Sequence, residues 1–149
     1  MPTSTATPLY ILDTNIWLDW LVFQTDVLDP LKAQHAAGKM TLIFTDDMLI
    51  ELTDVIGRAQ FKLSQAQQQT ALARFHQLAV RVDTRAKPAV LIRCKDADDQ
   101  VFIDQALAHR ATWLLSKDKH LLSLRSRAAK QQVLVGTIAD WLRTQKDVL

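Results

Sequence analysis

Short apolar runs that suit β-strands alternate along this chain with longer stretches that have the spacing of amphipathic helices. Such alternation is typical of a parallel sheet, in which each strand is followed by a helix that crosses back before the next strand begins. We therefore expect an α/β fold, specifically a three-layer α/β/α sandwich with a central parallel β-sheet. The expected strands are 9–12, 40–44, 80–82, 112–116 and 133–136, and the expected helices are 14–23, 27–39, 45–57, 64–79, 98–110 and 137–145.

The length of the chain and its single cysteine limit the class of protein. Its 149 residues suffice for one domain with a substantial core, and we expect a flexible tail over 1–8 and a single domain over 9–149. Cys94, the one cysteine, excludes a disulfide within the chain. The sequence has no signal-peptide pattern and no apolar run of the roughly 20 residues that span a bilayer, which indicates a cytoplasmic protein without a membrane segment.

An acidic residue stands where the first strand is expected to end. In "YILDTNIWLDW" the apolar strand pattern stops at Asp13, and a helical pattern with Thr14 or Asn15 near its N-cap begins directly afterwards. A carboxylate is costly to desolvate unless a partner compensates its charge. Because open α/β sheets bind ligands at the carboxyl ends of their strands, Asp13 is a candidate for chemistry.

Three more acids are expected near the same edge of the sheet. Glu51 borders the apolar stripe of its helix instead of facing water. Asp99 heads the apolar stripe of a later helix, so its side chain leans toward the sheet. Asp118 comes just after an expected strand. We therefore predict that these three carboxylates and Asp13 converge on one site.

Four converging carboxylates cannot all stay ionised without cations. Two like charges about 4 Å apart repel by about 4 kcal/mol at an effective dielectric constant near 20. A ligand set made only of oxygen suits Mg²⁺ or Mn²⁺ rather than Zn²⁺, and ions held in this way support in-line displacement at phosphorus. Taken singly, each acid is explained equally well by a helix cap or a surface salt bridge.

Basic residues gather in the second half of the chain. Residues 1–75 carry five Lys and Arg against eight Asp and Glu, whereas residues 76–149 carry thirteen against eight. Such an excess fits a surface that contacts phosphate groups, and it fits an ordinary solvated surface as well. The basic residues closest to the fourth acid are Lys117, Lys119, Arg125 and Arg127.

In this order and spacing, the motifs resemble those of PIN-domain ribonucleases over nearly the whole chain. "LDTNIWL" resembles the opening strand with the first acid, and "TDDMLIELTDVIGRAQF" resembles the helix with the second acid. "KDADDQVFIDQALAHRATWLLSKDKHLL" resembles the third-acid helix, the next strand and the fourth-acid turn, and "VLVGTIADWL" the closing strand and helix. The subgroup that the chain most resembles contains toxin components of bacterial toxin–antitoxin pairs.

The resemblance implies roles for individual residues. Thr14, Asn15 and Ser116 match polar residues that would orient the first acid or contact the substrate. Asp96 and Asp104 match acids found in parts of the subgroup, and either would supplement the site through a metal-bound water. The four acids that would both catalyse the reaction and bind metal are Asp13, Glu51, Asp99 and Asp118.

The resemblance is incomplete at two positions beside the fourth acid. Lys117 stands where the subgroup often has Gly or Asn, and His120 stands where it often has an acid. RNA binding would fall to the nearby basic residues, which are Lys117, Lys119, Arg125 and Arg127.

Together these features predict a metal-dependent endoribonuclease that uses Mg²⁺ or Mn²⁺ and hydrolyses phosphodiester bonds of single-stranded or structured RNA. Its expected protein partner is a cognate antitoxin. The sequence is also compatible with a homodimer. One alternative is a catalytically weak PIN-fold module that binds nucleic acid or the antitoxin. A domain that is phosphorylated on Asp13 is disfavoured, because Thr14 and Asn15 follow and the second Asp of such a nucleophile pair is missing.

Overall fold

The strands that the structure describes form one parallel sheet. The structure, a computed structural model, describes residues 7–147, so most of the tail expected over 1–8 lies outside it. The sheet has the order β3-β2-β1-β4-β5, and every neighbouring pair is parallel. Each strand lies within a residue of its predicted bounds. The strands are β1 (Leu9–Leu12), β2 (Thr41–Phe44), β3 (Ala79–Arg81), β4 (Trp113–Leu115) and β5 (Leu134–Gly136).

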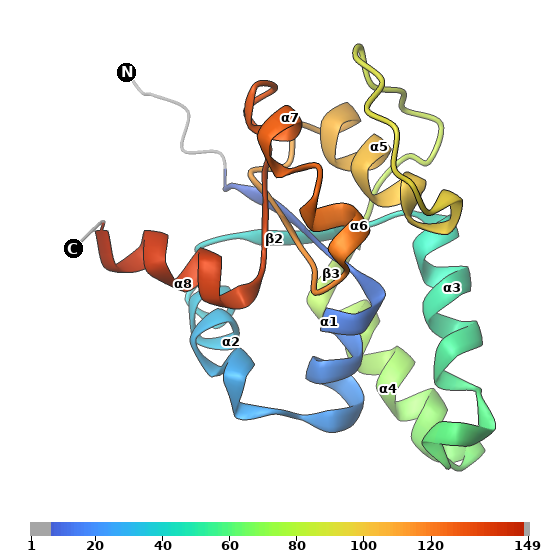
Figure 1. Cartoon of the computed structure of the whole chain (residues 1–149). Helices are drawn as coiled ribbons and strands as arrows, with labels where there is room; N and C mark the ends of the chain where they lie inside the picture. The colour runs from blue at the N-terminus through green and yellow to red at the C-terminus, as the bar shows by residue number, and fades with distance from the viewer. Residues whose placement is uncertain (1–6, 148–149) are drawn as a thin grey trace.

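Helices cover both faces of the sheet, which confirms the predicted α/β fold with its central parallel sheet. In Figure 1, α1, α2 and α4 lie on one side of the strands, and α5 and α7 lie on the other. Before β3 the helices are α1 (Thr14–Leu18), η1 (Asp19–Phe23), η2 (Asp26–Leu28), α2 (Asp29–Ala36), α3 (Asp46–Ile56), η3 (Ala59–Phe61) and α4 (Gln65–Leu78). After β3 they are η4 (Ala97–Asp99), α5 (Gln100–Ala108), α6 (Lys119–Leu122), α7 (Arg125–Ala129) and α8 (Ile138–Asp147).

The first helix differs from the one predicted over 14–23. Only its first five residues are α-helical, and it continues as the π-helix η1. Trp20 and Leu21 are both buried in η1. The N-cap is Asp13 rather than either of the two predicted residues, because Asp13 keeps an extended backbone and its side chain accepts a hydrogen bond from the N–H of Thr14, which is already helical.

Other helix boundaries follow from identifiable caps. Ser64 and Gln67 form a capping box at the start of α4. The helix predicted from residue 98 begins as the 3₁₀ turn η4 and becomes α-helical at Gln100. The short helices α6 and α7 were not predicted, because four or five residues are too few for a helical period to be recognised.

The four tryptophans of the chain are buried. Trp17 and Trp20 stack beside one another with ring centroids 5.5 Å apart, and Trp113 lies in β4. The indole N–H of Trp141 donates a hydrogen bond to the Tyr10 hydroxyl at 2.9 Å. This bond ties α8, near the end of the chain, to the central strand β1.

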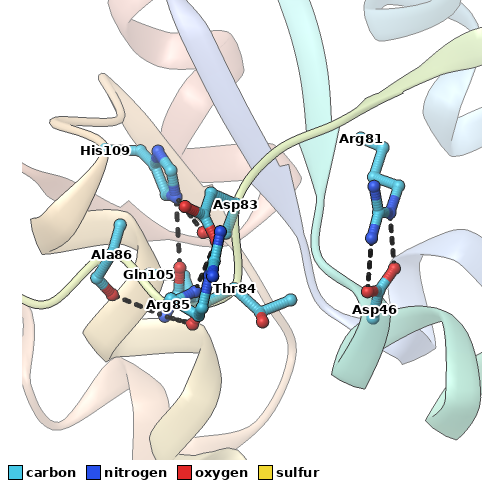
Figure 2. A network of polar contacts seen from close by, with 8 residues as sticks. All are labelled: Asp46, Arg81, Asp83, Thr84, Arg85, Ala86, Gln105 and His109. Atoms are coloured by element: carbon cyan, nitrogen blue, oxygen red, sulfur yellow. Dashed lines mark hydrogen bonds and ion pairs between the residues drawn. The ribbon is translucent and has the colours of Figure 1, made fainter.

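Hydrogen bonds from α5 hold the long connection between β3 and η4. Figure 2 shows Gln105 and His109 against the start of this connection, where the Gln105 amide donates to the carbonyls of Thr84 and Ala86. His109 Nε2 lies 3.0 Å from the carbonyl of Asp83. Residues 83–86, at the start of the connection, are therefore fixed to α5.

The end of the same connection is fixed by Gln100, at the start of α5. The Gln100 side chain accepts from the N–H of Cys94 at 2.7 Å and donates to the carbonyl of Ile92 at 2.8 Å. Both backbone groups are thus satisfied without a neighbouring strand. The arrangement places Asp96 close to Asp99, since the two are separated by a single 3₁₀ turn.

The order of the strands creates a switch point between β1 and β4. The chain runs outward from β1 to β2 and β3, and then returns to the other side of β1 to form β4 and β5. Ligands of open α/β sheets bind at the carboxyl ends of the two strands that flank such a reversal. The residues that follow β1 and β4 are Asp13 and Ser116.

We predict that Gln100→Leu loosens the segment that carries Asp96. The substitution removes both bonds to the connection and leaves the Cys94 N–H and the Ile92 carbonyl unpaired, at a cost of about 1–3 kcal/mol in unfolding free energy. Amide hydrogen exchange should accelerate most over 91–96. Exchange that rises equally in every element would contradict this local role.

Candidate metal centre

Asp13 is held at the carboxyl end of β1 by hydrogen bonds to both of its oxygens. The Thr14 N–H donates to Oδ1 at 2.6 Å, and the Ser116 hydroxyl donates to Oδ2 at 2.7 Å. Ser116 Oγ in turn accepts from the Asp118 N–H at 2.9 Å. A chain of bonds therefore links the end of β1 to the turn after β4. Asp13 is only 3% exposed, so these bonds operate away from water.

Burial makes the Asp13 carboxylate costly in the absence of a cation. Desolvation raises the pKa of Asp13 to about 6, although the hydrogen bonds from Ser116 and Thr14 oppose this rise. The nearby charges of Glu51 and Asp118 raise the pKa further. A bound cation would relieve both effects.

Asp96, Asp99 and Asp118 form the tightest group of acids in the described residues. One carboxylate oxygen from each lies within 4.8 Å of the others, and Asp99 is the buried member. Asp99 Oδ2 is a buried atom for which the described part of the chain provides no hydrogen-bond partner. A buried oxygen without a donor is costly unless another group, such as a cation, satisfies it.

The pKa values of Asp99 and Asp118 diverge. Burial raises the pKa of Asp99 to about 8, and the adjacent Asp118 raises it as well. Partial burial alone would raise the pKa of Asp118, but the Asp99 carboxyl and the His120 N–H lower it below its ordinary value. In the absence of a cation, the pair therefore favours one proton on Asp99 and a charge on Asp118.

Glu51 reaches the same pocket from α3. The Thr14 hydroxyl donates a hydrogen bond to Glu51 Oε2, which connects the second acid to the residue beside the first. The pocket has a volume of about 300 Å³. Its polar lining residues are Asp13, Thr14, Asn15, Glu51, Arg58, Gln60, Asp96, Asp98, Asp99 and Asp118.

The structure therefore brings the four predicted acids together in one pocket. Of the two acids predicted to supplement them, Asp96 and Asp104, only the first lies in that pocket. Asp96 belongs to the pocket, whereas Asp104 lines a different hollow and accepts a hydrogen bond from Gln100 at 2.9 Å. Arg58 and Asp98 also line the pocket but were not predicted for it. The Arg in "GRAQF" was the only sequence signal for Arg58, and the position of Asp98 off the helical stripe argued against it.

The four predicted basic residues divide into two kinds. Lys117 pairs with Asp19 at 2.7 Å, and Arg125 contacts Asp140 at 3.5 Å. The other two, Lys119 and Arg127, line a hollow of about 460 Å³ next to α6 and α7.

The donor set of the pocket fits a hard divalent cation. The groups that converge are carboxylate oxygens, and no His or Cys lines the pocket in the described residues. Mg²⁺ and Mn²⁺ prefer such ligands. Asp96, Asp99 and Asp118 are placed to hold an ion, and Asp13 and Glu51 line the same pocket.

Comparison with known proteins agrees with this arrangement. A family model described as PIN domain matches residues 10–120, which span the segments that carry the acids. The chain belongs to the PIN-domain family. No curated protein sequence matches this PIN domain.

A solved structure shares the fold. One chain of the crystal structure described as VapBC2 from Rickettsia felis bound to a DNA fragment from their promoter superimposes with a TM-score of 0.61. The two sequences are 17% identical, and the match covers 85% of this PIN domain and 96% of that chain. At this identity the likeness supports the fold alone.

We predict that, without divalent ions, this PIN domain loses stability between pH 5 and pH 9. Groups with raised pKa values stabilise the folded state below their unfolded pKa and lose that contribution as the pH rises through the folded values of about 6 and 8. For Asp13 the rise from 3.8 to about 6 corresponds to roughly 3 kcal/mol.

Urea unfolding at several pH values in EDTA tests this, with Mg²⁺ as the comparison. The ion should restore stability most at high pH, where the carboxylates are ionised. A free energy of unfolding in EDTA that rises from pH 5 to pH 9 would contradict the burial of ionisable acids described above.

Proposed function

We propose that the protein is a metal-dependent endoribonuclease that hydrolyses phosphodiester bonds of RNA. The proposal is carried by one observation: acids from four separate segments line a single pocket at the carboxyl edge of the sheet. Membership of the PIN-domain family, whose members are generally nucleases, supports it.

The proposed catalytic and metal-binding acids are Asp13, Glu51, Asp99 and Asp118, and Asp96 supplements them. We propose Mg²⁺ or Mn²⁺ as the cofactor, because the donors are all oxygen. When bound, such an ion activates water and stabilises the charge on the leaving oxygen at phosphorus. The carboxylates of the pocket repel one another and also repel the phosphates of RNA. We therefore expect the pocket to bind a cation before it binds RNA.

Residues beside the acids would orient them. The hydroxyl of Ser116 donates to Asp13, and the hydroxyl of Thr14 donates to Glu51, so each of these acids keeps one oxygen in a fixed direction. Asn15 lines the pocket with an exposed side chain, and we assign it to contact with the substrate.

We also propose that the protein is the toxin of a toxin–antitoxin pair. The resemblance of its motifs to toxin subgroup members supports this, as does the shared fold with a chain of the VapBC2 complex. The antitoxin would inhibit by covering the acidic pocket, and the toxin would act on cellular RNA in the cytoplasm. No helix in the described residues is long and apolar enough to cross a membrane.

Incubation with a defined single-stranded RNA tests the proposal. Cleavage should occur with Mn²⁺ or Mg²⁺ and stop with EDTA. Analysis of the product ends adds a second criterion, because hydrolysis by an activated water leaves no cyclic phosphate, whereas attack by the RNA's own 2′-hydroxyl does. Absence of cleavage under all metal conditions would favour the alternative, a PIN-fold module that only binds nucleic acid or the antitoxin.

We predict that Asp13→Asn separates chemistry from binding. The substitution removes one charge and keeps the shape of the side chain, so cleavage should fall about 100-fold or more. RNA affinity should persist or improve, because one repulsive charge is lost and the basic residues are unchanged.

Asp83→Asn is the matched control, since this exposed carboxylate lies outside the pocket and should leave cleavage unchanged. Cleavage, RNA binding and melting temperature are measured on the same samples. A structural cap at Asp13 would lower the melting temperature and leave activity per folded molecule intact, which would contradict the assignment.

A further inference from the structure

A second hollow, rich in basic residues, lies beside the acidic pocket. It has a volume of about 460 Å³. The end of the long connection contributes Arg93 and Lys95, and the segment after β4 contributes Lys119, His120 and Arg127. Two segments that are distant in sequence therefore bring cations to one place.

The four Lys and Arg side chains of this hollow are not neutralised by the protein. Within the part of the chain that the structure describes, none of them lies within 4.0 Å of a carboxylate oxygen, and all four are exposed. Lys117 and Arg125, by contrast, each contact an Asp. Uncompensated cations in a concave surface attract an anionic ligand.

The backbone holds Arg93 and Lys95 on the same side. Burial alternates along this segment: Ile92 and Cys94 are buried, and the two basic residues between and after them are exposed. A period of two puts alternate side chains on opposite faces of an extended chain. The two hydrogen bonds of Gln100 to this segment fix that orientation.

The hollow and the acidic pocket share a boundary in both segments. Lys95 is followed directly by Asp96, and Asp118 is followed directly by Lys119. In each case the acid lines the pocket and the base lines the hollow. An RNA strand that extends from the pocket between these two segments would therefore reach the hollow.

We propose that the basic hollow holds the phosphates of a single RNA strand next to the cleavage position. This inference rests on the proposed nuclease function and assigns the path of its substrate. The hollow has the volume of a pocket for a drug-sized ligand, which suits one or two nucleotides of a single strand rather than a duplex. Lys119 and Arg127, with Arg93 and Lys95, carry this contact, and the already paired Lys117 and Arg125 do not.

The test compares two double variants of the full chain. Arg93→Gln with Lys95→Gln removes two charges from the hollow. Lys32→Gln with Lys39→Gln is the control, because these residues lie on or just after α2, on the other side of the sheet from α7 (Figure 1). Binding of a fluorescent 12-nucleotide single-stranded RNA is measured in EDTA, which prevents cleavage, over a range of salt concentrations.

The hollow variant should bind the RNA about tenfold or more weakly than wild type. Its slope of log K against log salt should decrease by about 0.7 for each lost phosphate contact, hence by roughly 1.4. The control should stay within twofold of wild type. Arg127→Gln, from the other wall of the hollow, should weaken binding in the same direction.

Hydrolysis of bis(p-nitrophenyl) phosphate with Mn²⁺ distinguishes failure of this inference from failure of the proposed function. This small diester needs only the acidic pocket, so the hollow variant should hydrolyse it at the wild-type rate. If wild type cleaves the diester and RNA, and the hollow variant binds RNA as the control does, the assigned path is wrong. If wild type neither hydrolyses the diester nor binds RNA, the nuclease proposal fails and the inference with it.

Discussion

The Ser116 hydroxyl donates a hydrogen bond to Asp13 across the switch point between β1 and β4, at a distance of 2.7 Å. The same oxygen of Ser116 accepts from the Asp118 N–H, so one buried hydroxyl sets the position of two acids. Because Asp13 is buried and close to other carboxylates, its ionised form is costly in the folded protein. A cation bound in the pocket would offset this cost, because it would stabilise the ionised carboxylate.

The acids of the pocket and the bases of the hollow lie on separate but adjacent surfaces, and electrostatics gives a reason for this arrangement. Carboxylates that gather to bind a cation repel an RNA phosphate whenever the cation is absent. Cations mixed among those acids would pair with them and occupy the oxygens needed for the metal. Arg58 does line the acidic pocket, but it pairs with Asp54, which does not line it. The adjacent pairs Lys95–Asp96 and Asp118–Lys119 separate the two functions by one residue, which keeps the surfaces distinct and close.

Local sequence patterns determined much of this structure. The strands could be predicted because buried parallel strands are short apolar runs, and Ser64 could be recognised because a capping box is local. The convergence of Asp13, Glu51, Asp99 and Asp118 followed from helical period and strand ends. The places of Arg93 and Arg58 could not be predicted, because they depend on how a loop packs against distant helices. The π-helix η1 depends in the same way on tertiary burial of Trp20.

The central claim is that the acidic pocket binds a divalent cation through Asp99 and its neighbours. Calorimetric titration of the metal-free protein with Mn²⁺ measures this directly, without any assumption about the substrate. Wild type should bind Mn²⁺ with proton release that grows as the pH falls from 8 to 6, and Asp99→Asn should weaken binding at least tenfold. No binding by wild type, or equal binding by a folded Asp99→Asn variant, would contradict the account.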